Sequence, residues 1–174
     1  AFDKNIQIAV HYTDPLSEGY LEHKASLLEK YKVDYDVFGT SYYPYWHGDV
    51  RKLSVVLRKL SNFYHKKVMV MEVSYPFTND DGDGFGNVVS TMSANQEFKY
   101  PLTVEGQAIA VRDVIEAVAK VKGAGIGVFY WEPAWIPPKH FDLSRDDAEK
   151  VLAYNQNCWA KFGSGWATFN ARDY

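Results

Sequence analysis

Residues 68–73 read Val-Met-Val-Met-Glu-Val, a nearly continuous apolar run that a single charged residue, Glu72, interrupts. A strand with one face in solvent alternates apolar and polar residues, whereas a strand buried on both faces of a parallel sheet is apolar throughout. The run therefore predicts an interior strand of a parallel sheet. Glu72, near the end of this strand, needs an explanation of its own.

Similar apolar runs lie on both sides of this strand, with helical patterns between them. The other predicted strands are residues 6–11, 35–42 and 126–131. Apolar residues recur at helical spacing from Pro15 to Tyr31, from Asp49 to Tyr64 and from Ala108 to Lys122. The order βαβαβαβ predicts an α/β fold with a parallel sheet and right-handed crossovers. This pattern does not decide whether the sheet closes into a barrel or stays open. Residues 142–155 suggest a further helix, but the sequence shows no helix that would close a barrel as its eighth.

Composition narrows the possible partners. The 174 residues, 47% of them hydrophobic, suffice for one well-buried domain, and the net charge of −3 carries no basic run for a nucleic acid or an anionic membrane. No apolar run reaches the roughly 18 to 20 residues of a membrane span, and the N-terminus does not resemble a signal peptide. Cys158, the single cysteine, is interpreted as a buried small hydrophobe. The aromatic content of 16% suits a sugar-binding cleft, although large cores use aromatic residues too.

Functional groups of parallel α/β folds gather where the strands end, and these ends are rich in aromatic and titratable residues. A carboxylate ringed there by Tyr, Trp and His fits a glycosidase nucleophile, which must be ionised and opposed by a second carboxyl. Glu72 is the predicted nucleophile; the alternative is a structural ion pair with Lys or Arg. Glu132 is a rival, but its place after Trp131 favours a hydrogen-bonding role in the site.

Two histidines of the same strand ends are candidate site residues. His11 and His47 could orient the nucleophile or bind sugar hydroxyls, and simple packing is the alternative for each.

The loop that follows Glu72 has the pattern of a cation site. Asp81, Asp83 and Asn87 place side-chain oxygens at alternate positions between glycines, and Phe85 can add its carbonyl. Calcium is bound by such oxygens, so we expect a Ca²⁺ site here. The distal Glu of an EF-hand is missing, and a flexible Asp/Gly turn is the alternative.

Five segments together give the chain a close resemblance to a known family. They are FGTSYYPYWHG (38–48), VMVMEVSYPFT (68–78), YPLTVEGQAIAVRDVI (100–115), GVFYWEPAWIP (127–137) and FGSGWAT (162–168). With these segments the sequence resembles glycoside hydrolase family 53, the arabinogalactan endo-β-1,4-galactanases. The resemblance covers almost the whole chain in one order.

The resemblance implies a retaining (β/α)8 TIM barrel in which this chain supplies strands five to eight. Glu72 matches the nucleophile at the end of strand seven, Trp131 the aromatic floor of the cleft, and Tyr42, Trp46 and His47 its lining. The Asp-Gly loop matches a calcium-bound loop, and the family is usually secreted.

The same resemblance implies that the acid/base Glu after strand four lies outside these 174 residues, too few for eight strands. We therefore expect a β-1,4-galactan substrate and, as partner, the N-terminal half of the barrel, because the two sheet edges at residues 6–11 and 126–131 are otherwise unpaired. The alternatives are a catalytically silent sugar-binding half-barrel and a glycanase for another β-1,4-linked polymer such as mannan or cellulose.

Overall fold

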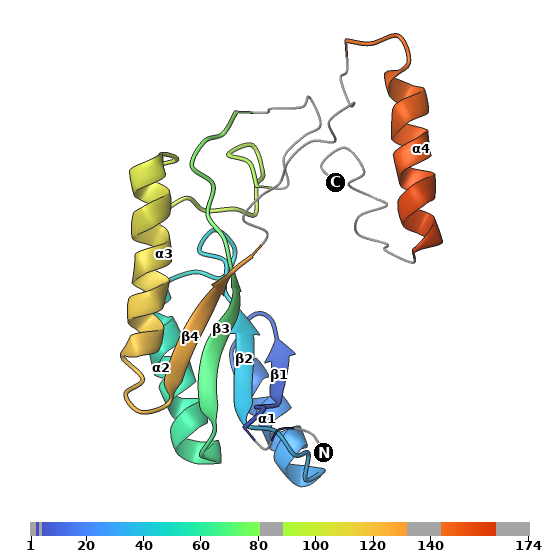
Figure 1. The fold of residues 1–174 in the computed structure, drawn as a ribbon. Coiled ribbons are helices and arrows are strands. Elements are labelled where there is room, and N and C mark those ends of the chain that lie inside the picture. Colours follow the sequence, from blue (N-terminus) through green and yellow to red (C-terminus); the bar gives the residue numbers. More distant parts are fainter. Residues whose placement is uncertain (1–2, 4, 81–88, 132–143, 163–174) are drawn as a thin grey trace. The chain divides into compact units, whose positions relative to one another are not determined.

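The computed structural model describes residues 3, 5–80, 89–131 and 144–162 (Figure 1). The chain forms two compact units. The first contains Ala1–Asn79 and Val89–Trp131, and the second contains Asp80–Val88 and Glu132–Tyr174. The first unit holds the sheet and the candidate site, and the second holds one described helix, α4 (Ala148–Lys161). No described helix is long and apolar enough to cross a bilayer.

The first unit is a four-stranded parallel sheet with helices between successive strands. Its elements are β1 (Ala9–Tyr12), α1 (Tyr20–Lys30), β2 (Val37–Ser41), α2 (Val50–Tyr64), β3 (Lys67–Val73), α3 (Val104–Ala119) and β4 (Gly125–Tyr130). Each strand pairs with the next along the chain, in the order β1-β2-β3-β4. Figure 1 shows α2 and α3 packed along one side of the sheet. The predicted βαβαβαβ order is confirmed.

The hydrophobic core lies between the sheet and these helices. Phe38 of β2 pairs with Val68 of β3, and both are buried against Leu53 and Leu57 of α2 and Val114 of α3. Full burial of each such side chain contributes about 1.5 to 3 kcal/mol, so this layer supplies much of the stability of the unit. The strand at 68–73 is an interior strand, as its composition predicts.

The opposite face of the sheet is tightly packed around a glycine. A Cβ atom on Gly39 would overlap the side chain of Met71 on the neighbouring strand and lie 3.1 Å from the carbonyl oxygen of Val10. Because Gly39 has no side chain, the Met71 side chain can lie over β2 at this position. This is the face of the sheet that also carries the candidate site.

A register irregularity coincides with Glu72. The pairing of β2 with β3 shifts between Thr40 and Ser41, so that Ser41 stands opposite Glu72, and the pairing of β3 with β4 shifts between Val70 and Val73. Val70 and Val73 both belong to the core although they are three residues apart. The extra residue turns Glu72 away from the core, as a β-bulge does.

Helix boundaries differ from the sequence expectation at three places. Helix α1 begins at Tyr20, well after Pro15, because Asp14 and the N-cap Gly19 are both left-handed, with φ of 52° and 69°. Helix α3 begins earlier than Ala108, since the Thr103 side chain accepts a hydrogen bond from the Gly106 amide and caps it. Helix α4 is displaced toward the C-terminus relative to residues 142–155.

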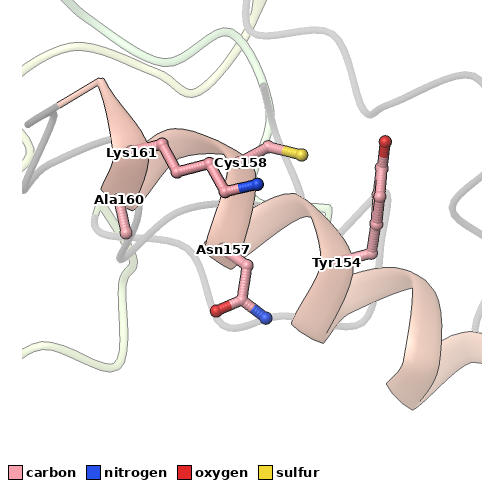
Figure 2. Close-up of a pocket in the computed structure, with 5 residues that line it drawn as sticks. All are labelled: Tyr154, Asn157, Cys158, Ala160 and Lys161. Atoms are coloured by element: carbon pink, nitrogen blue, oxygen red, sulfur yellow. The ribbon is translucent and has the colours of Figure 1, made fainter.

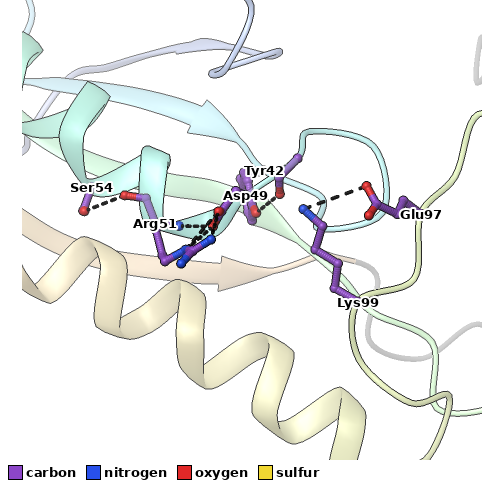
Figure 3. Close-up of polar contacts among 7 residues, drawn as sticks. Tyr42, Asp49, Arg51, Ser54, Glu97 and Lys99 are labelled. Carbon is purple, nitrogen blue, oxygen red and sulfur yellow. Dashed lines mark hydrogen bonds and ion pairs between the residues drawn. The ribbon is translucent and has the colours of Figure 1, made fainter.

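Helix α2 begins with an acidic N-cap that makes its stability sensitive to pH (Figure 3). The Asp49 carboxylate accepts hydrogen bonds from the side chain of Arg51, at 2.6 Å from Nη2, and from its backbone amide at 2.8 Å. These bonds lower the pKa of Asp49 to about 2. A lowered folded-state pKa means that the unfolded chain binds the proton first, so the stabilisation is complete above the ordinary Asp pKa of about 3.9 and is lost as the pH falls toward 2.

We expect Asp49→Ala to lower the melting temperature at pH 7, with the difference from the parent shrinking between pH 4 and pH 2. Thermal unfolding at several pH values measures it. Asp34→Ala, in an exposed loop, is the matched control and should change stability less at every pH. A difference that stays constant down to pH 2 would contradict the role of the ionised cap.

Candidate active site

Glu72 lies at the C-terminal end of β3, as predicted, and two hydroxyl groups hold its carboxylate. Ser41 Oγ donates to Glu72 Oε2 at 2.9 Å, and Tyr43 Oη donates to the same oxygen at 2.9 Å. The other carboxylate oxygen, Oε1, lies 3.9 Å from His11 Nδ1. Among the described residues no Lys or Arg pairs with Glu72, which removes the structural ion-pair alternative within that part of the chain.

The three partners of Glu72 come from two neighbouring strands and the loop after β2. His11 is on β1, Ser41 ends β2, and Tyr43 follows it. The Glu72 side chain keeps 21% of its surface exposed, so its carboxylate is both held and accessible. A fixed, accessible carboxylate is the arrangement that nucleophilic attack on a sugar carbon requires.

His47 ties two loops together. Its Nδ1 accepts a hydrogen bond from the Tyr43 backbone amide at 3.0 Å, and its Nε2 lies 3.1 Å from the Asp14 carboxylate. Burial lowers the pKa of His47, and the neighbouring Asp14 opposes that effect. The neutral ring with its proton on Nε2 satisfies both contacts, so His47 fixes the backbone of Tyr43. Its side chain is only 9% exposed, and a place for His47 in the lining of the sugar cleft stays a prediction.

Tyr42 differs from the expectation that it lines the cleft. Its side chain is completely buried in the core, and its hydroxyl donates to the Gly48 carbonyl at 2.7 Å (Figure 3). Burial raises the pKa of Tyr42. Tyr42 has no surface with which to contact a sugar in this structure. Because side chains alternate along an extended chain, Tyr42 takes the core side while Ser41 and Tyr43 take the side of Glu72.

Two tryptophans of the predicted site are partly exposed. Trp46 is 40% exposed and packs edge-on against the rings of Tyr43 and Tyr45. Trp131 is 42% exposed, and its backbone amide donates to Val73, which extends the pairing of β4 with β3 by one residue. Each offers an indole surface of the kind that sugar rings pack on.

Ser41 and Tyr43 are the residues of the site that the sequence reasoning did not single out. Their position in the sequence was the available signal, because both lie at the end of the strand beside Glu72. Ser41 and Tyr43 are two residues apart, so their side chains share one face. The remaining candidate residues, Glu132 and the proposed metal ligands Asp81, Asp83, Phe85 and Asn87, lie outside the described residues. Within the described part, no cluster of three or more His, Cys, Asp or Glu side chains could hold a metal.

A pocket also lies beside α4 in the second unit (Figure 2). Its described lining residues are Tyr154, Asn157, Cys158, Ala160 and Lys161. Cys158 is half-buried rather than buried, and its hydrogen bond with Tyr154 raises the pKa of that tyrosine. No carboxylate is among these lining residues, so the pocket lacks the groups of glycosidase chemistry in the part described.

Known proteins share both this sequence and this fold. The chain is 49% identical, over 99% of its length and 38% of the relative's, to an endo-β-1,4-galactanase of Bacillus subtilis (strain 168). It is 37% identical, over 76% of its length and 34% of the relative's, to an arabinogalactan endo-β-1,4-galactanase of Cellvibrio japonicus (strain Ueda107). The chain thus spans less than two fifths of the length of these relatives.

Solved structures agree with the sequence comparison. The GH53 catalytic domain of Ignisphaera aggregans superimposes with a TM-score of 0.69 and 34% identity, over 78% of this chain and 38% of that domain. A fungal β-1,4-galactanase superimposes with a TM-score of 0.59 at 24% identity, over 76% of this chain and 40% of the other, which shows the fold alone. The parallel sheet and its helices are therefore part of a (β/α)8 barrel, the fold of this family.

The match to the family itself is nearly complete along the chain. Residues 1–171 match the family described as glycosyl hydrolase family 53. Together with the held carboxylate at the end of β3, this match establishes that the chain belongs to glycosyl hydrolase family 53.

Proposed function

We propose that this chain supplies the nucleophile, Glu72, of an endo-acting retaining glycosidase that cleaves β-1,4-galactosidic bonds. The observation that carries the proposal is the asymmetric holding of the Glu72 carboxylate. Oε2 accepts two hydroxyl hydrogen bonds, whereas among the described residues Oε1 has only the 3.9 Å approach of His11. Oε1 is the oxygen with a free lone pair in the described part of the site, so it is the attacking atom.

The reaction is a double displacement. Glu72 Oε1 forms a bond to the anomeric carbon while the glycosidic C–O bond breaks and the leaving oxygen takes a proton from a second carboxylic acid. That carboxyl, now a base, removes a proton from water, which attacks the anomeric carbon and releases Glu72. We propose that the second carboxyl belongs to the half of the barrel outside these residues, about 5 to 5.5 Å from Glu72 as retention requires.

The choice of substrate rests on the relatives. Two of them carry the names endo-β-1,4-galactanase and arabinogalactan endo-β-1,4-galactanase. The exposed indoles of Trp46 and Trp131 supply apolar surfaces for sugar rings on the first unit. We propose β-1,4-galactan as the polymer. Because a polysaccharide is too large to enter cells, we also propose that the protein is secreted.

The test is a chimera in which this chain replaces the matching segment of the Bacillus subtilis relative. We expect the chimera to release reducing sugar from β-1,4-galactan, and the 174-residue chain alone to release none. Activity on mannan or cellulose in place of galactan would change the substrate assignment. An inactive chimera that folds and still binds galactan would favour a silent sugar-binding half-barrel.

We also propose a calcium ion in the loop at residues 81–87. Carboxylate and amide oxygens of Asp81, Asp83 and Asn87, with the Phe85 carbonyl, form a donor set that suits Ca²⁺. The ion would be structural, joining parts of one loop, and takes no part in the displacement.

Because a ligand that binds only the folded state stabilises it, calcium should raise the melting temperature of the parent chain. The double substitution Asp81→Ala with Asp83→Ala should remove this increase and change little when a chelator is present. Thermal unfolding with calcium, with magnesium and with chelator measures it. A calcium response that survives the double substitution would rule out this site.

A further inference from the structure

Three side chains on three adjacent strands form a chain of hydrogen bonds that ends at Glu72. His11 Nε2 lies 2.8 Å from Ser41 Oγ, and Ser41 Oγ lies 2.9 Å from Glu72 Oε2. The parallel pairing brings them together, since His11 stands opposite Gly39, two residues before Ser41, and Ser41 stands opposite Glu72. All three therefore share the face of the sheet away from the helices.

The chemistry of the hydroxyl group fixes the direction of each bond. An ionised carboxylate only accepts hydrogen bonds, so the single proton of Ser41 must point to Glu72. The Ser41 oxygen is then left with lone pairs, and the nearby Nε2 of His11 must carry a proton and donate it. The opposite tautomer would direct the Ser41 proton to the histidine and leave two oxygen lone pairs facing each other at 2.9 Å.

We infer that His11 is a positioning residue that acts on the nucleophile through Ser41: its Nε2–H orients the Ser41 hydroxyl toward Glu72 Oε2, which presents Oε1 to the sugar. This inference rests on the proposed role of Glu72. Of the two roles that the sequence suggests for His11, orienting the nucleophile and binding sugar hydroxyls, the inference takes the first, because Nε2 is occupied by Ser41 and Nδ1 lies 3.9 Å from Oε1. Two-thirds of the His11 side chain is buried, with 32% exposed.

The first test needs no activity. Long-range ¹H–¹⁵N spectra of the 174-residue chain, labelled with ¹⁵N-histidine, report which ring nitrogen of His11 carries the proton. We expect the Nε2–H form at neutral pH, and a mixture of tautomers in Ser41→Ala, where the fixed acceptor is gone. His11→Gln identifies the signal by its loss. An Nδ1–H form in the parent, or a signal that ignores Ser41→Ala, would overturn the inference.

The second test is a double-mutant cycle in the chimera. A neutral hydrogen bond contributes modestly, so His11→Phe and Ser41→Ala should each lower kcat about 3- to 10-fold with KM nearly unchanged. Because His11 acts through Ser41, the double variant should be no slower than Ser41→Ala alone. His11→Gln, whose amide can replace Nε2–H as a donor, should recover most of kcat. His23→Gln, on the exposed surface of α1, is the matched control.

The two failures are distinguishable. If the losses of kcat multiply in the double variant and KM rises for His11→Phe, His11 contacts the sugar directly. That result would overturn the inference that His11 acts through Ser41. An inactive parent chimera would instead count against the proposed function, while the tautomer measurement would still decide the contact between His11 and Ser41.

Discussion

Replacing Glu72 with Gln in the chimera lowers kcat on β-1,4-galactan by a factor on the order of 10⁴ to 10⁶, the loss typical of removing a covalent nucleophile. The amide keeps the size of the side chain and can still accept from Ser41 and Tyr43, but it is too weak a nucleophile to form the glycosyl-enzyme. Galactan binding should remain close to that of the parent, because the carboxylate acts mainly on the transition state. Reducing-sugar release and binding isotherms on the same preparations measure both.

Glu97→Gln is the matched control for charge. Its side chain is 75% exposed, and within the described part of the chain it makes only a long 3.9 Å ion pair with Lys99, visible in Figure 3. We expect kcat within a factor of about two of the parent, since surface ion pairs of this kind contribute little. A Glu72→Gln protein that unfolds or loses galactan binding would assign Glu72 a structural role, and one with nearly full turnover would remove it from the reaction.

The second large effect is on folding. A Cβ atom at Gly125 would overlap the Val118 carbonyl oxygen, and the Gly125 amide already donates to Val121 at 2.7 Å. Backbone atoms on both sides leave no room for a methyl group. We expect Gly125→Ala to lower the free energy of unfolding by about 3 kcal/mol, the upper part of the usual range for overpacking.

Gly127 offers a control on the same strand. A Cβ there meets no atom of the described residues within 4 Å, and its φ is not left-handed. Gly127→Ala should therefore change stability by no more than about 0.5 kcal/mol. Urea unfolding of the two variants and the parent gives both values. If Gly125→Ala lowers the stability as little as Gly127→Ala does, the turn between α3 and β4 can move to accept a side chain.

The sequence predicted the parallel sheet because strong apolar runs alternate with helical patterns, and it predicted Glu72 because a charge in such a run is rare. One expected lining residue is misplaced. The family resemblance places Tyr42 in the cleft lining, whereas alternation along the chain directs its side chain into the core. The irregular pairing at Glu72 could not be predicted, because a bulge depends on neighbouring strands rather than on local composition.

Boundaries were missed where backbone conformation, not hydrophobicity, decides them. Pro15 after Asp14 looks like a helix start, but the left-handed Asp14 leads into a turn that continues to Gly19. The Asp14 carboxylate does not cap a helix and instead contacts His47. A residue that joins two loops gives no periodic signal in the sequence.

The order of strands in the sheet, in which every strand pairs with its neighbour along the chain, bears on how the protein is synthesised. Ala9 pairs with Val37 and Val37 with Lys67, so each pairing closes a loop of only one helix and its turns. Short loops lower the contact order and favour rapid folding. On the ribosome, β1, β2 and β3 can therefore assemble as they emerge, and the strand that carries Glu72 can be paired on one side before β4 has been translated.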